Sequence, residues 1–232
     1  MTALPAAPRI VGRVAVSVLA LLCFNPLYSQ REEDYLAWTH TEAVAIGKKM
    51  EGKGRAKGGG ARWLKTERAF SYKLRATWLT PEVIRATARL VQARDGLSDD
   101  ETRELVVEAE DVGDTVIMVE IDPDEGSGVI PLDWRALLHQ RGMRPGSRES
   151  VKGENRPNLR HVRALAGVSR RNYDYDRFWV VFPLRTEEGT PLFPPGSVEA
   201  ELLVGIHSEE GRVRWRVPTS IIERSNTPTP RD

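Results

Sequence analysis

The stretch VEAELLVGIHSEEGRVRWRV, residues 198–217, decides the fold. Apolar residues alternate with polar ones on both sides of the central SEEG, and a period of two is typical of half-buried strands. Gly211 suits the positive φ that a hairpin turn requires. We therefore expect a β-hairpin with a four-residue turn at 208–211. The cross-strand pairs that this register predicts are Ile206–Val213, Val204–Trp215 and Leu202–Val217.

Other strands are expected upstream of the hairpin. Residues 70–78 alternate between apolar and polar side chains, and residues 115–121 and 177–184 are short, strongly apolar runs bounded by polar or turn residues. We also expect a short strand at 129–132, after the Pro- and Gly-containing turn DPDEGSG. Residues 141–158 are rich in Gly, Pro, Ser and Arg and predict a loop.

Helices are expected between the first two of these strands. Thr80 and Pro81 are typical of a helix start, and Gly96 of its end. Ser98 with Glu101 forms a capping box for a second helix, through about residue 111. A further short helix is expected from 133 to 139. Together these elements predict an α+β fold, an antiparallel β-sheet or β-sandwich (immunoglobulin-like by shape only) with an inserted αα-hairpin.

The N-terminal 29 residues have the three parts of a secretory signal peptide. Residues 1–13 contain two arginines and no acid, residues 14–24 are an uncharged and almost wholly apolar run, and the small residue Ser29 ends the segment. The run is shorter than the about 20 residues of a membrane-spanning helix. We therefore expect export to the periplasm or the extracellular space. A lipid anchor on Cys23 is less favoured, because Leu22 stands where a lipobox has a small residue.

The rest of the chain divides by composition. Residues 30–62 are expected to be a flexible basic arm, with room for a short helix at 34–46, because the Gly- and Lys-rich stretch 47–62 has almost no apolar residues. Residues 63–223 are expected to form a single compact α+β domain. Residues 224–232 are expected to be a disordered tail.

Overall composition excludes several classes of protein. The 232 residues include 34 Lys and Arg against 33 Asp and Glu, so the chain is neither a globally basic nor a globally acidic binder. A single Cys excludes a disulfide framework and a Cys-rich zinc site. No motif of a serine hydrolase or a zinc protease is present, and no cofactor is predicted. Arginine greatly outnumbers lysine, which favours a GC-rich bacterial genome as the source.

Charge is segregated along the chain. Residues 47–68 contain eight basic and two acidic residues, residues 95–125 thirteen acidic and one basic, and residues 135–177 eleven basic and four acidic. Either these blocks neutralise one another across the folded surface, or a basic block binds an anionic partner. The basic arm is the better candidate for such binding. Its anionic partner would be lipid headgroups, an envelope polymer or nucleic acid.

Two groups of side chains are candidate sites. Tyr, Arg and Asn are enriched at interfaces, and the outward side of the hairpin carries a row of arginines. The candidate binding residues are Arg170, Arg171, Tyr173, Tyr175, Arg212, Arg214 and Arg216. Carboxylates around a Gly-rich turn suit calcium, although the spacing departs from that of an EF-hand. The candidate calcium ligands are Asp122, Asp124, Glu125 and Asp133.

These observations favour an exported, non-catalytic binding or envelope-assembly module. Its partner would be an unknown protein or an anionic envelope polymer, with membrane contact only through the signal peptide or the basic arm. Export disfavours nucleic acid. The alternative is a secreted hydrolase with a carboxylate/histidine site. A deep pocket with two or more acids, or His139 or His161 beside a serine, would favour the enzyme. A shallow surface displaying residues 170–175 would favour binding.

Overall fold

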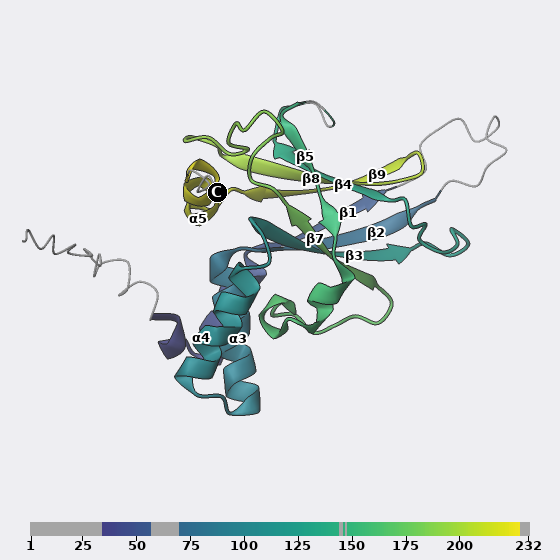
Figure 1. The fold of residues 1–232 in the computed structure, drawn as a ribbon. Helices are drawn as coiled ribbons and strands as arrows, with labels where there is room; N and C mark the ends of the chain where they lie inside the picture. The colour runs from purple at the N-terminus through teal and green to yellow at the C-terminus, as the bar shows by residue number, and fades with distance from the viewer. Residues whose placement is uncertain (1–33, 57–69, 144–145, 147, 228–232) are drawn as a thin grey trace, which may run out of the picture. The chain divides into compact units, whose positions relative to one another are not determined.

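The computed structural model describes residues 34–56, 70–143, 146 and 148–227, which belong to one compact unit of the chain. They form an α+β fold with two antiparallel sheets in neighbouring layers (Figure 1). The predicted fold class is confirmed at this level. The predicted signal peptide, residues 1–29, lies outside the described residues. Among the residues that are described, no helix combines the length and apolar character needed to cross a bilayer.

In the described part of the chain, nine strands build the two sheets. The five-stranded sheet has the order β1 (Glu51–Ala56), β2 (Tyr72–Leu79), β3 (Thr115–Pro123), β7 (Asp176–Phe182) and β6 (Glu154–Asn155). The four-stranded sheet has the order β5 (Ser150–Lys152), β4 (Arg135–Gln140), β8 (Glu199–Ile206) and β9 (Glu209–Arg216). The helices are α2 (His40–Lys48), α3 (Pro81–Asp95), α4 (Asp99–Glu110) and α5 (Thr219–Asn226), with 3-10 turns η1 (Asp34–Ala37), η2 (Pro157–His161) and η3 (Arg163–Leu165).

The larger apolar core lies between the two sheets. The alternation predicted for β2 is confirmed, and its side chains buried toward the second sheet are Tyr72, Leu74, Ala76 and Trp78. The rings of Trp78 and Trp215 have centroids 5.7 Å apart. The Tyr72 hydroxyl donates to the carbonyl oxygen of Val204 at 2.6 Å and accepts from the amide of Gly211 at 2.9 Å. This buried hydroxyl ties β2 to both strands of the hairpin, and its burial raises the pKa of Tyr72.

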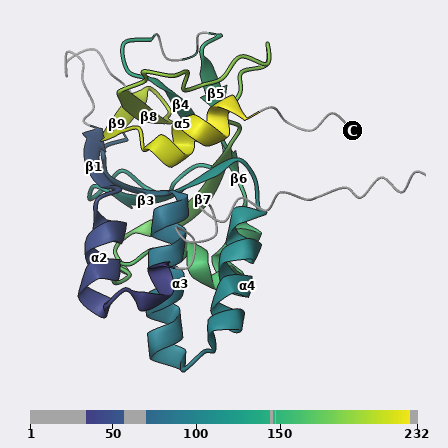
Figure 2. The same cartoon turned by 90° about the vertical axis from the view of Figure 1, so that its left-hand side faces the viewer.

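A second core lies between the helices and the other face of the five-stranded sheet (Figure 2). Both predicted helices are confirmed, as α3 and α4. Gly96 ends α3 with a φ of 68°, and Ser98 and Glu101 form the capping box of α4. Thr80 stands at the N-cap of α3 but makes no side-chain capping bond. The helices cover the part of the sheet that carries Leu79, Val116, Met118, Trp179 and Val181.

Two segments predicted to be flexible contain regular structure. Within the predicted arm, residues 51–56 form β1, which pairs with β2 along its whole length. Within the predicted tail, residues 224–226 belong to α5, where the Ser225 hydroxyl donates to the carbonyl oxygen of Leu184. Both predictions are therefore wrong for these residues. Residues 57–62 and 228–232 lie outside the described residues.

The glycines of β1 explain why it was missed. Gly52 and Gly54 face the second sheet, where a Cβ on Gly52 would come within 2.1 Å of Val213 and one on Gly54 within 2.3 Å of the carbonyl oxygen of Arg212. Close packing against β9 therefore requires glycine at both positions. The strand is ordered by backbone pairing and close approach rather than by large apolar side chains.

The region between β3 and the hairpin also differs from its prediction. Val129 and Leu132 are almost fully exposed and do not form a strand. Residues 133–139 were predicted to be helical, but 135–140 form β4, which pairs with β8. The short run RALLHQ fits either period, and the free edge of β8 favours the extended form. Two short strands, β5 and β6, lie within the predicted loop.

The C-terminal hairpin is confirmed as β8 and β9, but its predicted register is wrong. Leu202 pairs with Val213 rather than with Val217, and Trp215 pairs with Ala200. Each partner is displaced by four residues from its predicted position. Because the displacement is even, the same side chains still face the core. Trp215 is buried as predicted, with 6 % of its surface exposed.

Gly211 lies in β9 in the observed register, and not in the turn. A Cβ at this position would lie 3.0 Å from the side chain of Leu74 and 3.1 Å from that of Tyr72. The glycine is therefore used for close packing of β9 on β2, and not in the turn. The turn instead has two residues, His207 and Ser208, and His207 takes a φ of 52°. Contacts outside the hairpin thus select between two registers that bury the same face.

Candidate functional site

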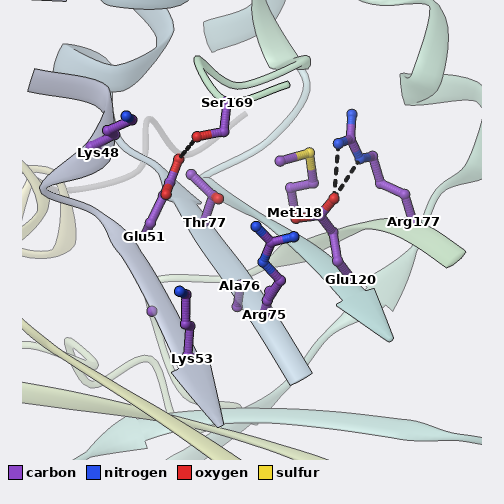
Figure 3. A pocket seen from close by; sticks show the side chains of 11 residues that line it. Lys48, Glu51, Lys53, Arg75, Ala76, Thr77, Met118, Glu120, Ser169 and Arg177 are labelled. Atoms are coloured by element: carbon purple, nitrogen blue, oxygen red, sulfur yellow. Dashed lines mark hydrogen bonds and ion pairs between the residues drawn. The ribbon is translucent and has the colours of Figure 1, made fainter. Parts of the chain in front are cut away.

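The face of the five-stranded sheet turned away from the second sheet is only partly covered by helices. Beyond the covered part, a hollow of about 230 Å³ opens beside the end of α2 (Figure 3). Its lining comes from β1, β2, β3 and β7, together with α2 and the segment that precedes β7. The side chains that give it its chemistry are Lys48, Glu51, Lys53, Arg75, Glu120, Ser169 and Arg177.

Four of these side chains form one row across four adjacent strands. Lys53 lies opposite Arg75, Arg75 opposite Glu120, and Glu120 opposite Arg177. Directly opposed residues of antiparallel strands have Cβ atoms about 4.5–5.5 Å apart, and like charges opposed in this way are destabilising. The pairing of Lys53 with Arg75 is therefore unfavourable for the fold by itself.

Both carboxylates of the hollow are held by neighbours. Glu120 is 7 % exposed, and its Oε1 accepts from Arg177 Nη2 at 2.8 Å and from Arg177 Nε at 3.2 Å. Oε1 of Glu51 accepts from the hydroxyl of Ser169. These bonds fix the two carboxylates at either side of the hollow.

The cations are less completely matched. Within residues 34–56, 70–143, 146 and 148–227, no carboxylate lies within ion-pair distance of Lys48, Lys53 or Arg75. The Arg75 guanidinium instead lies over the ring of Tyr175, 5.0 Å from its centroid. The hollow therefore presents an excess of positive charge and a fixed arginine.

This arrangement is suited to binding an anion. Lysine and arginine donate charge-assisted hydrogen bonds to carboxylate and phosphate oxygens, and the hydroxyl-bearing residues Thr77 and Ser169 also line the hollow. The lining contains neither histidine nor cysteine, the residues that most often serve as a general base or an activated nucleophile. The carboxylates Glu51 and Glu120 are the side chains of the lining that could take part in acid/base chemistry.

The first group of predicted binding residues lies in the segment between Ser169 and Arg177, two residues that line the hollow, although none of the group lines it. The segment 170–175 starts beside Ser169, which lines the hollow, and ends at Tyr175, which supports Arg75. Between them, Tyr173 is 83 % exposed and the Arg171 guanidinium lies 4.9 Å from the centroid of its ring. Arg170 is exposed. These residues form a displayed edge next to the hollow.

The second predicted group, on β9, lies elsewhere. Arg212, Arg214 and Arg216 are on the outer face of the four-stranded sheet. Arg214 Nε donates to the buried carboxylate of Glu201 at 2.6 Å, and Arg212 Nη1 donates to its other oxygen at 3.3 Å. His139 Nε2 is 3.7 Å from the same carboxylate. Two of the three arginines are therefore engaged in the fold.

The candidate calcium ligands do not lie together as one site: Asp122 is paired with Lys73 and Asp124 with Arg55, both at 2.7 Å. Glu125 and Asp133 are exposed. No group of three or more His, Cys, Asp and Glu side chains in the described part of the chain could hold a metal ion. Asp122 and Asp124 thus form ion pairs with basic side chains of β2 and β1.

Sequence reasoning missed the row of charged residues across the strands. One signal was available, because Glu120 is the single charged residue in the otherwise apolar run TVIMVEI. A carboxylate in such a strand requires a partner or a function. The other members of the row could not be assigned without the strand order, which places β1 and β7 beside β2 and β3.

Comparisons of the chain with protein-family models, curated proteins and solved structures give no match. No known activity is therefore brought to the chain by similarity. The hollow, and the segment 170–175 at its edge, carry the functional argument.

Proposed function

We propose that the protein is a non-catalytic binding module that holds an anionic group in the hollow of the five-stranded sheet. The observation that carries this proposal is the gathering of Lys48, Lys53 and Arg75 around one hollow without carboxylate partners among the described residues. A bound anion would relieve the opposition of Lys53 and Arg75 on neighbouring strands. The site is therefore expected to be more stable with an anion bound than without one.

Each part of the site has a distinct contribution to binding. Arg75 is held by the ring of Tyr175, so that little side-chain freedom is lost on binding. Lys48 and Lys53 add charge from α2 and β1. Arg170, Arg171 and Tyr173 extend the contact surface beyond the hollow. A partner longer than the hollow, such as an anionic envelope polymer, would contact both the hollow and this adjoining surface.

The cellular setting is part of the proposal. The signal-peptide pattern of residues 1–29 supports export to the periplasm or the extracellular space. An exported protein meets anionic envelope polymers and other exported proteins, and rarely nucleic acid. We therefore propose an envelope-assembly or envelope-binding role for the chain.

Titration of the purified chain with polygalacturonate, a carboxylated polysaccharide, tests the anion site. Calorimetry should show binding that weakens as salt is added, and none to neutral dextran. Arg75→Ala should weaken binding about tenfold, since it removes a charge-assisted hydrogen bond. Arg216→Ala, an exposed arginine on the other sheet, is the matched control and should change little. Equal losses in both variants would contradict a defined site.

The alternative, a secreted hydrolase, has two supporting observations. The hollow contains two carboxylates, Glu51 and Glu120, as an acid/base pair would require. The second observation is a set of residues on the other sheet. Ser150, His139 and Glu201 lie opposite one another on β5, β4 and β8. However, His139 is fully buried, its Nδ1 contacts the carbonyl oxygen of Gln140, and its Nε2 faces Glu201. A serine needs an available imidazole nitrogen as its base, and neither nitrogen faces Ser150. Hydrolysis of ester or glycoside substrates that is lost in Ser150→Ala would favour the enzyme instead.

The finer description of the fold belongs with these proposals. We infer that the stacked sheets form a β-sandwich and that α3 and α4 are an αα-hairpin inserted between β2 and β3. The support is that β2 and β3 are adjacent antiparallel strands joined by these two helices. The immunoglobulin-like shape stays a prediction.

A further inference from the structure

The hollow contains two carboxylates as well as its cations, and this combination restricts the ligand. Four cations (Lys48, Lys53, Arg75 and Arg177) and two acids (Glu51 and Glu120) line it, so the lining is positive overall. A site built for a bare phosphate or a simple carboxylate would gain nothing from Glu51 and Glu120, because like charges repel the ligand. Their presence indicates that the ligand also carries hydrogen-bond donors.

Each carboxylate is held by hydrogen bonds to one of its oxygens, and its other oxygen accepts none from the described residues. Arg177 donates twice to Oε1 of Glu120, and Ser169 donates to Oε1 of Glu51. No hydrogen bond between described residues reaches Oε2 of either side chain. An ionised carboxylate only accepts. The hollow therefore has two fixed acceptors beside three cations that lack a carboxylate partner.

The order of the charges places donors and acceptors close together. In the row across the sheet, Glu120 stands between Arg75 and Arg177, and Glu51 is two residues from Lys53 on the same face of β1. Figure 3 shows Arg75 lying between Lys53 on one side and Glu120 on the other. A ligand that contacts Arg75 through an anionic group is within reach of both acceptors through short substituents.

The hollow is small, with a volume of about 230 Å³, and it is open to solvent on one side. It can therefore enclose one compact unit of a ligand, such as a sugar ring with an acidic substituent, while the rest of a longer ligand stays outside. A zwitterion such as an amino acid has the donors but no net charge to match the positive lining.

We propose that the hollow binds an acidic monosaccharide unit, with its carboxylate or phosphate on Arg75 and Lys53 and its hydroxyls donating to Glu51 and Glu120. This inference rests on the proposed anion-binding function and names its ligand class. The acid and the hydroxyls are recognised by different residues, so the two can be tested separately.

The test is a calorimetric comparison of ligands that share an anionic group and differ in hydroxyls. Glucuronate is compared with acetate, glucose 6-phosphate with inorganic phosphate, and glucose serves as the neutral ligand. Glucuronate should bind at least about tenfold more tightly than acetate, the size expected for hydrogen bonds to a charged acceptor. The stronger of the two sugar acids identifies the anionic group.

Variants then assign the hydroxyl contacts. Glu120→Gln should reduce the glucuronate-to-acetate ratio several-fold, and the ratio removes the change in charge that affects both ligands. Glu51→Gln should do the same, and keeps the test valid if Glu120→Gln does not fold. Glu125→Gln, which changes an exposed carboxylate outside the hollow, should leave the ratio unchanged.

The outcomes separate the two proposals. If glucuronate and acetate bind equally, or if neither Glu51→Gln nor Glu120→Gln lowers the ratio, the sugar inference is overturned while anion binding stands. If no anion binds, whether or not it carries hydroxyls, the anion-binding function itself is overturned. If a zwitterionic amino acid binds more tightly than both sugar acids, the acceptors serve an ammonium group and the sugar assignment is wrong.

Discussion

The outer faces of the two sheets carry charge in different ways. On the four-stranded sheet four arginines are paired with carboxylates. These pairs are Arg135 and Arg212 with Glu210, Arg141 with Glu199, and Arg212 and Arg214 with Glu201. On the five-stranded sheet, Lys48, Lys53 and Arg75 border a hollow without such partners in the described residues. A row of arginines in a sequence is therefore weak evidence for binding. Whether those arginines can bind a ligand depends on whether carboxylates of the fold already pair with them.

Strand order produces this difference. The central strand β8 places Glu201 opposite Arg214 on one side and His139 on the other. In the five-stranded sheet, by contrast, β1 and β2 both place a cation in the same row. The first arrangement brings opposite charges together, whereas the second leaves two like charges opposed among the described residues.

The largest expected effect concerns the shared core that supports both faces. Trp215→Ala should reduce the free energy of unfolding by about 3–5 kcal/mol, because it removes a buried ring that packs on Trp78. Arg216→Ala, on the opposite side of the same strand, should change it by less than about 0.5 kcal/mol. Urea melts of both variants measure the difference. Similar losses would mean that the two sides of β9 are not core and surface.

The next largest effect is expected when the ion pairs on the outer face of the four-stranded sheet are broken. Glu201→Ala leaves Arg212, Arg214 and His139 around a site where the carboxylate was almost fully buried. Breaking a buried pair costs about 3–5 kcal/mol, and solvent around the half-exposed arginines lowers this to about 2–3 kcal/mol. Thermal and urea unfolding measure it, with Glu187→Ala as an exposed control. A loss no greater than in the control would remove the distinction between the two faces.

The corresponding change on the open face should hardly affect stability. Arg75→Ala removes a cation that has no carboxylate partner, and only a cation–π contact of about 0.5–1 kcal/mol is lost. Relief of the opposed charge on Lys53 offsets part of this loss. Urea melts should therefore show a change below about 1 kcal/mol, while anion binding falls. A loss as large as in Glu201→Ala would show that Arg75 is structural.

The smallest effect extends the comparison to an ion pair at the end of α3. A hydrogen bond from Arg94, together with the nearby Arg163, lowers the pKa of Asp95 from 3.8 to about 2. Because this pKa is lower in the folded protein, the pair stabilises the fold above about pH 3.8 and loses this contribution as the pH falls through about 2. A carbon-13 titration of the Asp95 carboxyl should have its midpoint at about 2. In Arg94→Ala the midpoint should rise, and an unchanged midpoint would assign the shift to Arg163.

Sequence periodicity predicted the elements whose side chains signal their own environment. Strands β2, β3, β7, β8 and β9 carry large apolar residues on their inward faces, and α3 and α4 carry recognisable ends. Strand β1 was missed because its inward residues are Gly52 and Gly54, which pack closely without apolar bulk. Strand β4 was missed because RALLHQ fits a helix equally well until β8 provides backbone partners.

The candidate site was predictable only in part, for a related reason. The segment 170–175 was selected because Arg and Tyr together are typical of interfaces, and the structure places its Tyr175 against Arg75. The row from Lys53 to Arg177 joins residues far apart in the sequence, and it exists only through the strand order. The arginines of β9 were predicted to face outward correctly, but Glu201 beside them was not recognised as their partner.

The hydrogen bond between Tyr72 and Gly211 has a consequence for the kinetics of folding. The hairpin is local in sequence, yet the residues that select its register are 139 positions apart. In an isolated peptide of residues 198–217 we expect both registers to be accessible, since both bury the same face. We expect docking on β2 to favour the observed register, with its two-residue turn at His207. Folding rates fall when the decisive contacts are distant in sequence. We therefore expect the hairpin to form early in folding and to adopt its native register late, when it docks on β2.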